Sequence, residues 1–112
     1  MLSLGHNKTI YVYRGIVDMR CGRYRLASLV QNELGNVPTG GDYFVFFNRR
    51  RTSVKVLYFD KSGYALWYKV LEKGTYPFVS KGILSVAEMH CILEGIEVKK
   101  SRKREYFSLP KH

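Results

Sequence analysis

Apolar runs alternate with short polar breaks along most of this chain, and the period of each run indicates the element that it forms. Residues 9–13 are β-branched or aromatic almost throughout. Arg14-Gly15 ends that run, so the pattern predicts a first strand at 9–13.

Residues 18–34 carry apolar side chains at helical spacing. The apolar positions are Leu26, Leu29, Val30 and Leu34. Asp18 suits an N-cap, and Gly35 suits a left-handed C-cap. We therefore predict a helix over residues 18–34.

Three strand-like runs then follow within residues 43–71. They cover 43–47, 54–59 and 64–71, and polar breaks at 48–52 and 60–63 separate them. Connections this short join antiparallel neighbours, so the pattern predicts an antiparallel meander.

The next segment, Tyr76-Pro77-Phe78, forms an edge at most, because proline cannot donate to a sheet ladder. Ser85 and Glu88 have the spacing of a capping box and predict a short helix near 86–94. We expect a single α+β domain over residues 1–98, in which the meander packs against two helices.

The chain is strongly basic, with 19 Lys and Arg against 9 Asp and Glu, a formal charge of +10 and a pI near 9.8. This balance favours nucleic acid or an anionic membrane as the partner. No run reaches the roughly 18 apolar residues of a membrane-spanning helix, and the first six residues lack a signal-peptide pattern. The expectation is a soluble, cytoplasmic protein with no membrane partner.

Basic side chains gather in three segments of the sequence. The break between the first two meander strands carries Arg49, Arg50 and Arg51, with Lys55 shortly after. The predicted first helix carries Arg20, Arg23 and Arg25 on its polar side. A basic run near the C-terminus contains Lys99, Lys100, Arg102, Lys103 and Arg104.

Each basic segment has a functional and a structural interpretation. Arginines on a hairpin turn are positioned in advance for phosphates, but they also pair with nearby acids such as Asp42 or Asp60. Helical arginines are commonly just solvated. Mutual repulsion in the C-terminal run predicts a flexible basic tail over residues 99–112, which adds affinity for phosphates or only solubility.

Candidate chemistry is sparse. Cys21 and Cys91 lie far apart in apolar patterns, so we predict buried free thiols, no metal site and no cofactor. Asp60 and Glu72 are expected at opposite ends of one strand pair, which disfavours a metal-dependent nuclease. A small basic ribonuclease that needs no metal is the enzymatic alternative.

An ordered series of motifs resembles a known family. The residues that carry it are Val17-Asp18-Met19-Arg20-x-Gly22, Leu26-x-x-Leu29-Val30, Phe44-Val45-Phe46-x-Asn48-Arg49-Arg50, Lys55-x-Leu57, Asp60-x-x-Gly63, Leu66-x-x-Lys69-x-Leu71-Glu72-x-Gly74 and Leu93-x-Gly95. Over about residues 1–97 the chain is similar to the accessory protein of insertion-sequence 66 transposons, the product of the second open reading frame. Departures from that pattern include Cys21, Phe59 and Val70.

The resemblance implies a non-enzymatic role in DNA transposition, beside a larger transposase and a second small accessory protein. It supplies no mechanism and leaves two hypotheses open. In the first, the protein binds DNA at transposon ends. In the second, it bridges its protein partners, and an aromatic edge near Trp67 and Tyr68 provides the contact surface.

Overall fold

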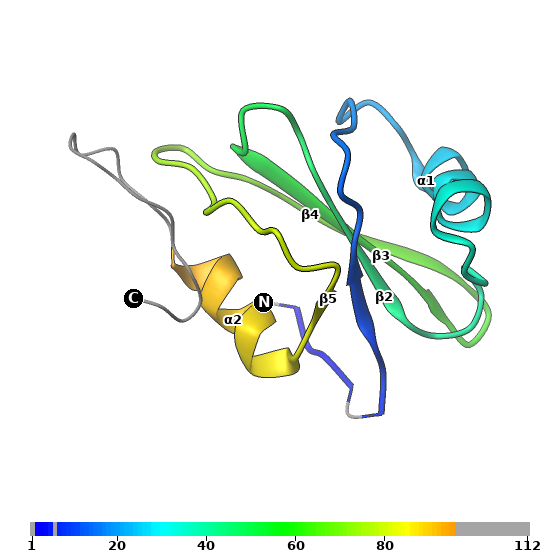
Figure 1. Cartoon of the computed structure of the whole chain (residues 1–112). Helices are drawn as coiled ribbons and strands as arrows, with labels where there is room; N and C mark the ends of the chain where they lie inside the picture. Colours follow the sequence, from blue (N-terminus) through cyan, green and yellow to red (C-terminus); the bar gives the residue numbers. More distant parts are fainter. Residues whose placement is uncertain (1, 6, 96–112) are drawn as a thin grey trace.

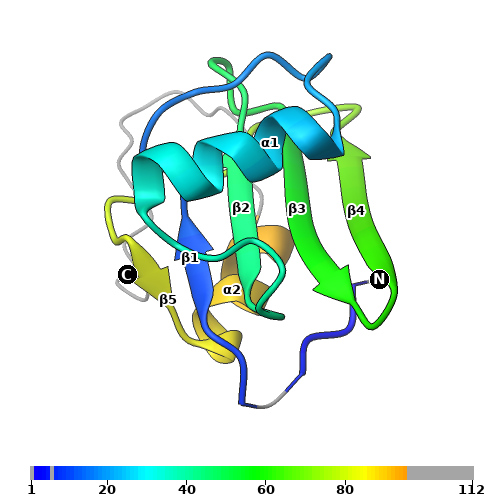
Figure 2. The same cartoon turned by 90° about the vertical axis from the view of Figure 1, so that its right-hand side faces the viewer.

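A five-stranded mixed sheet forms the centre of the protein, with helices on both faces (Figures 1 and 2). The computed structural model describes residues 2–5 and 7–95. The elements in chain order are β1 (Ile10–Val12), α1 (Arg23–Leu29), the π-helical turn η1 (Val30–Leu34), β2 (Tyr43–Phe47), β3 (Ser53–Asp60), β4 (Gly63–Val70), β5 (Ile83–Leu84) and α2 (Val86–Glu94).

The strand order is β4-β3-β2-β1-β5. Strands β2, β3 and β4 form the antiparallel meander that the sequence predicts, within a residue or so of the expected bounds. β1 runs parallel to β2, and β5 pairs with β1 in the antiparallel direction. The parallel pair arises because α1 and η1 return the chain from β1 to β2 across one face of the sheet.

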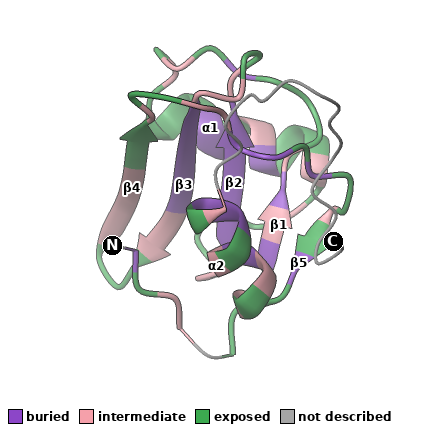
Figure 3. Cartoon of the chain, turned by 90° about the vertical axis from the view of Figure 1, so that its left-hand side faces the viewer, coloured by how far each residue is buried: buried purple, intermediate pink, exposed green. Residues whose placement is uncertain are grey.

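β2 explains the two-sided architecture, because all five of its side chains are buried (Figure 3). Tyr43, Val45 and Phe47 belong to the core on the α2 side of the sheet. Phe44 and Phe46 belong to the core on the α1 side. A strand with apolar side chains on both faces needs cover on both faces, which α1 with η1 and α2 supply.

The helix termini agree with the sequence signals at two places and differ at a third. Gly35 caps η1 with φ 69°, and Ser85 begins α2 with a complete capping box to Glu88. The expected N-cap at Asp18 is wrong, because α1 begins at Arg23 after Gly22. Asp18 instead accepts a hydrogen bond from the Arg20 backbone, at 2.8 Å.

Residues 18–22 stay out of the helix because a buried lysine bonds two of their carbonyl groups. Lys55 Nζ donates to the carbonyl oxygens of Met19 and Cys21, at 2.7 Å each. Helical geometry would commit those carbonyls to intrahelical bonds and leave a buried ammonium group without acceptors. Burial of Lys55 therefore sets where α1 begins.

The cysteines are free, as predicted, but the prediction that they are buried is wrong. Cys21 is partly exposed and Cys91 is exposed. Each falls on an apolar pattern, yet Cys21 lies in the loop before α1 and Cys91 on the outer side of α2.

We predict that Ser85→Ala lowers the free energy of unfolding by about 1 kcal/mol, because Ser85 accepts from the Glu88 backbone at 3.0 Å. Urea denaturation of the variant measures this loss. Ser80→Ala, at an exposed position outside the helix, is the matched control and should stay within about 0.5 kcal/mol of the wild type. Equal stability of the two variants would contradict a role for the capping box.

Candidate nucleic-acid interface

Asn48 fixes the turn between β2 and β3. Its Oδ1 accepts from the backbone N–H groups of Thr52 and Ser53, at 2.9 and 3.1 Å, and its Nδ2 donates to Thr52 Oγ1 at 3.1 Å. The backbone N–H of Arg51 donates to the Asn48 carbonyl at 3.1 Å. The turn that carries the three arginines is therefore held by side-chain and backbone bonds together.

Arg51 anchors this turn to the body of the protein. Its guanidinium donates twice to the Pro77 carbonyl, at 3.2 Å from Nε and 3.0 Å from Nη2. The same group lies 4.4 Å from the centre of the Phe47 ring and 5.3 Å from that of Phe78. Burial lowers the pKa of Arg51 below its usual value, but an arginine pKa remains far above neutral pH, so the group stays charged.

Arg49 and Arg50 have a different environment, since both are exposed. Within residues 2–5 and 7–95, the ion pairs are Arg20 with Asp18 and Lys81 with Glu88. Asp42 and Asp60 lie at the other end of the sheet from the turn, just before β2 begins and where β3 ends. Pairing of these two arginines with Asp42 or Asp60, the structural alternative considered for the turn, does not occur.

Other cations lie at the same end of the sheet. Since β1 and β2 are parallel, Arg14 after β1 and the β2–β3 turn both follow carboxyl ends of strands. Backbone bonds from Tyr13 to Val45 and from Val17 to Phe47, at 2.9 and 3.1 Å, keep the chain after β1 beside β2. Figure 1 shows residues 14–22 and the β2–β3 turn side by side at the top.

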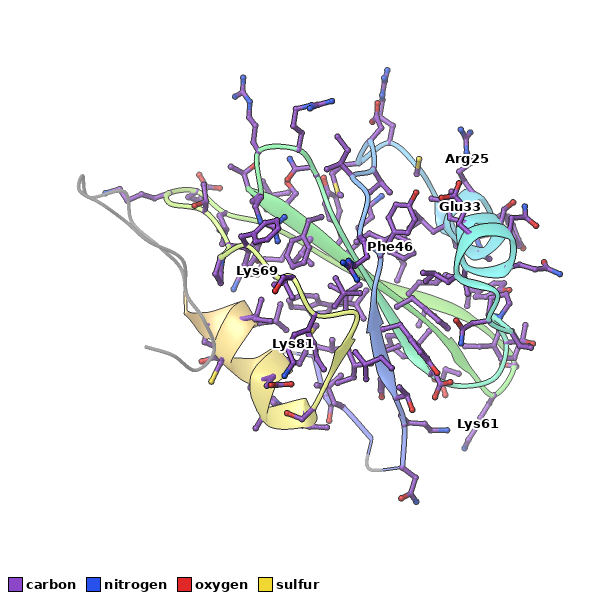
Figure 4. All side chains as sticks on the ribbon, viewed as in Figure 1. Arg25, Glu33, Phe46, Lys61, Lys69 and Lys81 are labelled. Atoms are coloured by element: carbon purple, nitrogen blue, oxygen red, sulfur yellow. The ribbon has the colours of Figure 1, made fainter. Side chains whose placement is uncertain are left out.

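Arg20 and Arg25 extend this basic surface toward α1. Both line an open hollow of about 390 Å³ together with Asp18, Cys21 and Gly22. Figure 4 shows Arg25 pointing from α1 toward the end where the β2–β3 turn lies. We name the surface of Arg20, Arg25, Arg49 and Arg50 the cationic end; Arg14 follows β1 at this end, but its guanidinium turns back toward Gly82.

Two of the arginines near α1, Arg20 and Arg23, contact neighbouring side chains. Arg20 donates to both Asp18 oxygens, with Nη2 at 2.6 Å from Oδ2, and these bonds lower the pKa of the Asp18 carboxyl to about 2. The guanidinium of Arg23 lies 4.8 Å from the centre of the adjacent Tyr24 ring. The paired charge of Arg20 contributes less to an anion site than the unpaired charges of Arg49 and Arg50.

Lys55 is the sequence candidate whose position fits DNA contact least. It is 6% exposed, its Nζ is bonded to two carbonyl oxygens, and the same atom lies 4.7 Å from the centre of the Tyr68 ring. Its role is to hold the segment before α1 against β3. The candidates Lys99, Lys100, Arg102, Lys103 and Arg104 lie outside the described residues.

Asp60 and Glu72, the carboxylates considered for catalysis, lie at opposite ends of the β3–β4 strand pair. Asp60 pairs with Gly63 at one end of the β3–β4 ladder, whereas Ser53 pairs with Val70, two residues before Glu72, at the other. The expectation that the two carboxylates lie apart is confirmed. In the described part of the chain, no three His, Cys, Asp or Glu side chains come close enough to hold a metal ion.

Comparison with known proteins establishes the family. Residues 8–103 match the model of the IS66 Orf2 like protein family. The chain belongs to this family. The resemblance seen in the motifs is thus confirmed, and the match also includes Lys99, Lys100, Arg102 and Lys103, beyond the range that the motifs covered.

Two relatives from Sinorhizobium fredii are similar over most of their length. "Uncharacterized protein y4hO" is 35% identical over 101 residues, which cover 87% of this chain and 88% of the relative. "Uncharacterized protein y4jC" is 33% identical over 108 residues, with 93% and 92% covered. No solved structure matches the chain.

Family membership associates the chain with the accessory proteins of IS66 transposons. Among the described residues, no helix has the length and apolar character needed to cross a membrane.

Sequence reasoning missed Arg14 because it treated the first strand in isolation. The strand–helix–strand order of residues 9–47 is the signal for parallel pairing, and that pairing places the backbone of Arg14 beside the end of β2.

We predict that Arg51→Ala lowers the free energy of unfolding by about 2 kcal/mol, since it removes charge-assisted hydrogen bonds and a ring contact. Arg49→Ala and Arg50→Ala are the matched controls from the same turn and should change stability by less than about 0.5 kcal/mol. Thermal or urea unfolding distinguishes the two classes. A loss at Arg49 or Arg50 as large as that at Arg51 would show that the turn is not anchored as described.

Proposed function

We propose that this protein is a non-catalytic accessory factor of IS66 transposition that binds DNA through phosphate contacts at the cationic end. The observation that carries the proposal is the pair Arg49 and Arg50, exposed and without an acidic partner in the described structure, on a turn held by Asn48 and Arg51. Family membership supports the transposition context.

An ordered turn lowers the loss of conformational entropy on binding. An arginine on a mobile segment loses backbone freedom when it binds, whereas the backbone of this turn is already ordered. The guanidinium group matches the phosphate group in charge and geometry and forms two parallel hydrogen bonds with it. Exposed arginines on an ordered turn are therefore suited to a polyanion.

The proposed contacts are to phosphates rather than to base edges. Arg49 and Arg50 extend from a short turn, whereas sequence readout in the major groove is usually made by a helix or a two-stranded ribbon that enters the groove. Phosphate contacts fix position and orientation without selecting a sequence. In this proposal, the choice of transposon ends comes from the transposase and the second small accessory protein, acting with this chain in the cytoplasm.

The C-terminal basic run adds to the same interaction in this proposal. Lys99, Lys100, Arg102, Lys103 and Arg104 would increase affinity for any duplex through released counterions. The domain would supply phosphate contacts from an ordered turn, and the basic run would supply electrostatic affinity for any DNA sequence.

The salt dependence of duplex binding tests the proposal. Each phosphate contact contributes about 0.9 to the slope of log affinity against log salt. We expect Arg49→Ala/Arg50→Ala to reduce that slope by about two, with similar losses for transposon-end and random duplexes. Fluorescence anisotropy over a range of salt concentrations measures it.

The matched control removes two charges at the other end of the protein. Lys8 precedes β1 and Lys61 lies in the β3–β4 turn, where Figure 4 shows it far from the cationic end. Lys8→Gln/Lys61→Gln has the same net charge as the double alanine variant and should keep nearly the wild-type slope. Equal slopes for the two double variants would mean that only net charge matters and would overturn the proposed site.

A further inference from the structure

The two edges of the sheet differ greatly in length. β5 contributes two residues to one edge, whereas β4 contributes eight to the other. No described strand pairs with the outer side of β4. Long exposed edges are usually protected by proline, bulges or several charges, yet β4 has no proline and Lys69 is its one charged residue.

The register of the β3–β4 pair shows which backbone groups face outward. The N–H of Leu71 donates to the Thr52 carbonyl at 2.8 Å, and Ser53 pairs with Val70 next to it. Hydrogen-bonded and non-hydrogen-bonded pairs alternate along an antiparallel ladder. The residues whose backbone N–H and C=O groups point away from β3 are therefore Tyr64, Leu66, Tyr68 and Val70.

We propose that a second copy of this chain pairs antiparallel with β4 around a two-fold axis at Trp67, so that two sheets become one. In this register Leu66 lies opposite Tyr68 of the second copy, and Tyr64 lies opposite its Val70. Every outward-facing residue then finds a backbone partner. Shifting the register by two residues leaves some of these groups unpaired, so the Trp67-centred register is preferred.

Side-chain chemistry favours a second copy as the occupant. On the α1 side of the sheet, the new cross-strand pairs join aromatic to aliphatic groups, which stabilise antiparallel strands. Tyr68 and Val70 are 49% and 52% exposed in the single chain and would be covered. On the other side, Trp67 meets Trp67 of the second copy.

Charge compatibility supports the same register. A chain with a formal charge of +10 repels its own copy over most of its surface. Along β4, however, Lys69 lies opposite the neutral Ala65 of the second copy, so no like charges face each other. A polyanion is a poor occupant of this edge, because it would meet Tyr64, Leu66, Tyr68 and Val70 with one cation among them.

The arrangement has a consequence for the cationic end. β4 finishes beside the β2–β3 turn, since Val70 pairs with Ser53. Antiparallel pairing then places the two cationic ends at opposite ends of the shared sheet. Such a dimer presents two separate basic surfaces, which suits contact with two DNA segments. The dimer itself does not depend on DNA binding and is tested without DNA.

Charge variants at positions 65 and 69 test the register by sedimentation equilibrium. Ala65 is partly exposed and Lys69 is exposed, so both tolerate substitution. Ala65→Lys places two lysines face to face at both symmetric positions and should weaken dimerisation about tenfold. Ala65→Glu should strengthen it, and Ala65→Lys/Lys69→Glu should restore it by reversing the pair.

A disulfide between copies tests the same contact covalently, in a Cys21→Ser/Cys91→Ser background. In the proposed register residues 65 and 69 of different copies form a non-hydrogen-bonded pair, whose Cβ separation is compatible with a disulfide. Oxidised Ala65→Cys/Lys69→Cys should therefore run as a covalent dimer, while either single cysteine variant stays unlinked. Within one chain the two positions are about 13 Å apart and cannot bond.

Two results would overturn the proposal. One is a protein that is monomeric at about 100 µM in physiological salt, well above the dissociation constant of a modest interface. The other is a dimer that Ala65→Lys does not weaken and that the paired cysteines do not link, because its interface would then lie elsewhere. Circular dichroism of each variant confirms that the fold is retained.

Discussion

β2 is buried on both faces, and this burial determines how the other elements are arranged around it. Its five consecutive apolar side chains need cover from two layers, and the chain supplies α1 with η1 on one face and α2 on the other. Charged groups are consequently kept out of both cores, with Lys55 as the exception among the described residues. The positive charge of the chain is left for the ends and rims of the sheet, where it is available to a polyanion.

The cationic end shows how similar neighbouring residues acquire different roles. Arg49, Arg50 and Arg51 are chemically identical, but Arg51 points back to Pro77 and Phe47 while the other two face solvent. Partial burial of Arg51 costs desolvation, which its hydrogen bonds and ring contact offset. In return, the turn presents the remaining two arginines from an ordered backbone, which the proposed phosphate contacts require.

The features that sequence predicts well are those set by local chemistry. The meander follows from apolar runs and short turns, and α2 follows from Ser85 and Glu88. The features that it misses depend on distant partners: Arg51 bonds a carbonyl 26 residues away, and Lys55 one 36 residues away. Such contacts form only when the sheet has assembled. Nothing in the neighbouring sequence therefore indicates that Arg51 and Lys55 act as anchors, or that α1 begins later than its apolar pattern suggests. The sequence predicts a basic turn with three arginines, but it does not show that Arg49 and Arg50 are the two that stay exposed.

In the proposed function, an ordered turn presents Arg49 and Arg50, and not Arg51, to DNA phosphates. Nuclear magnetic resonance of the arginine Nε–Hε groups during titration with a duplex of random sequence tests it most directly. We expect the Arg49 and Arg50 signals to shift and these shifts to disappear at high salt, while the signal of Arg51, which is bonded to Pro77, changes little. Shifts that are largest for Arg51, or unchanged Arg49 and Arg50 signals at low salt, would contradict it.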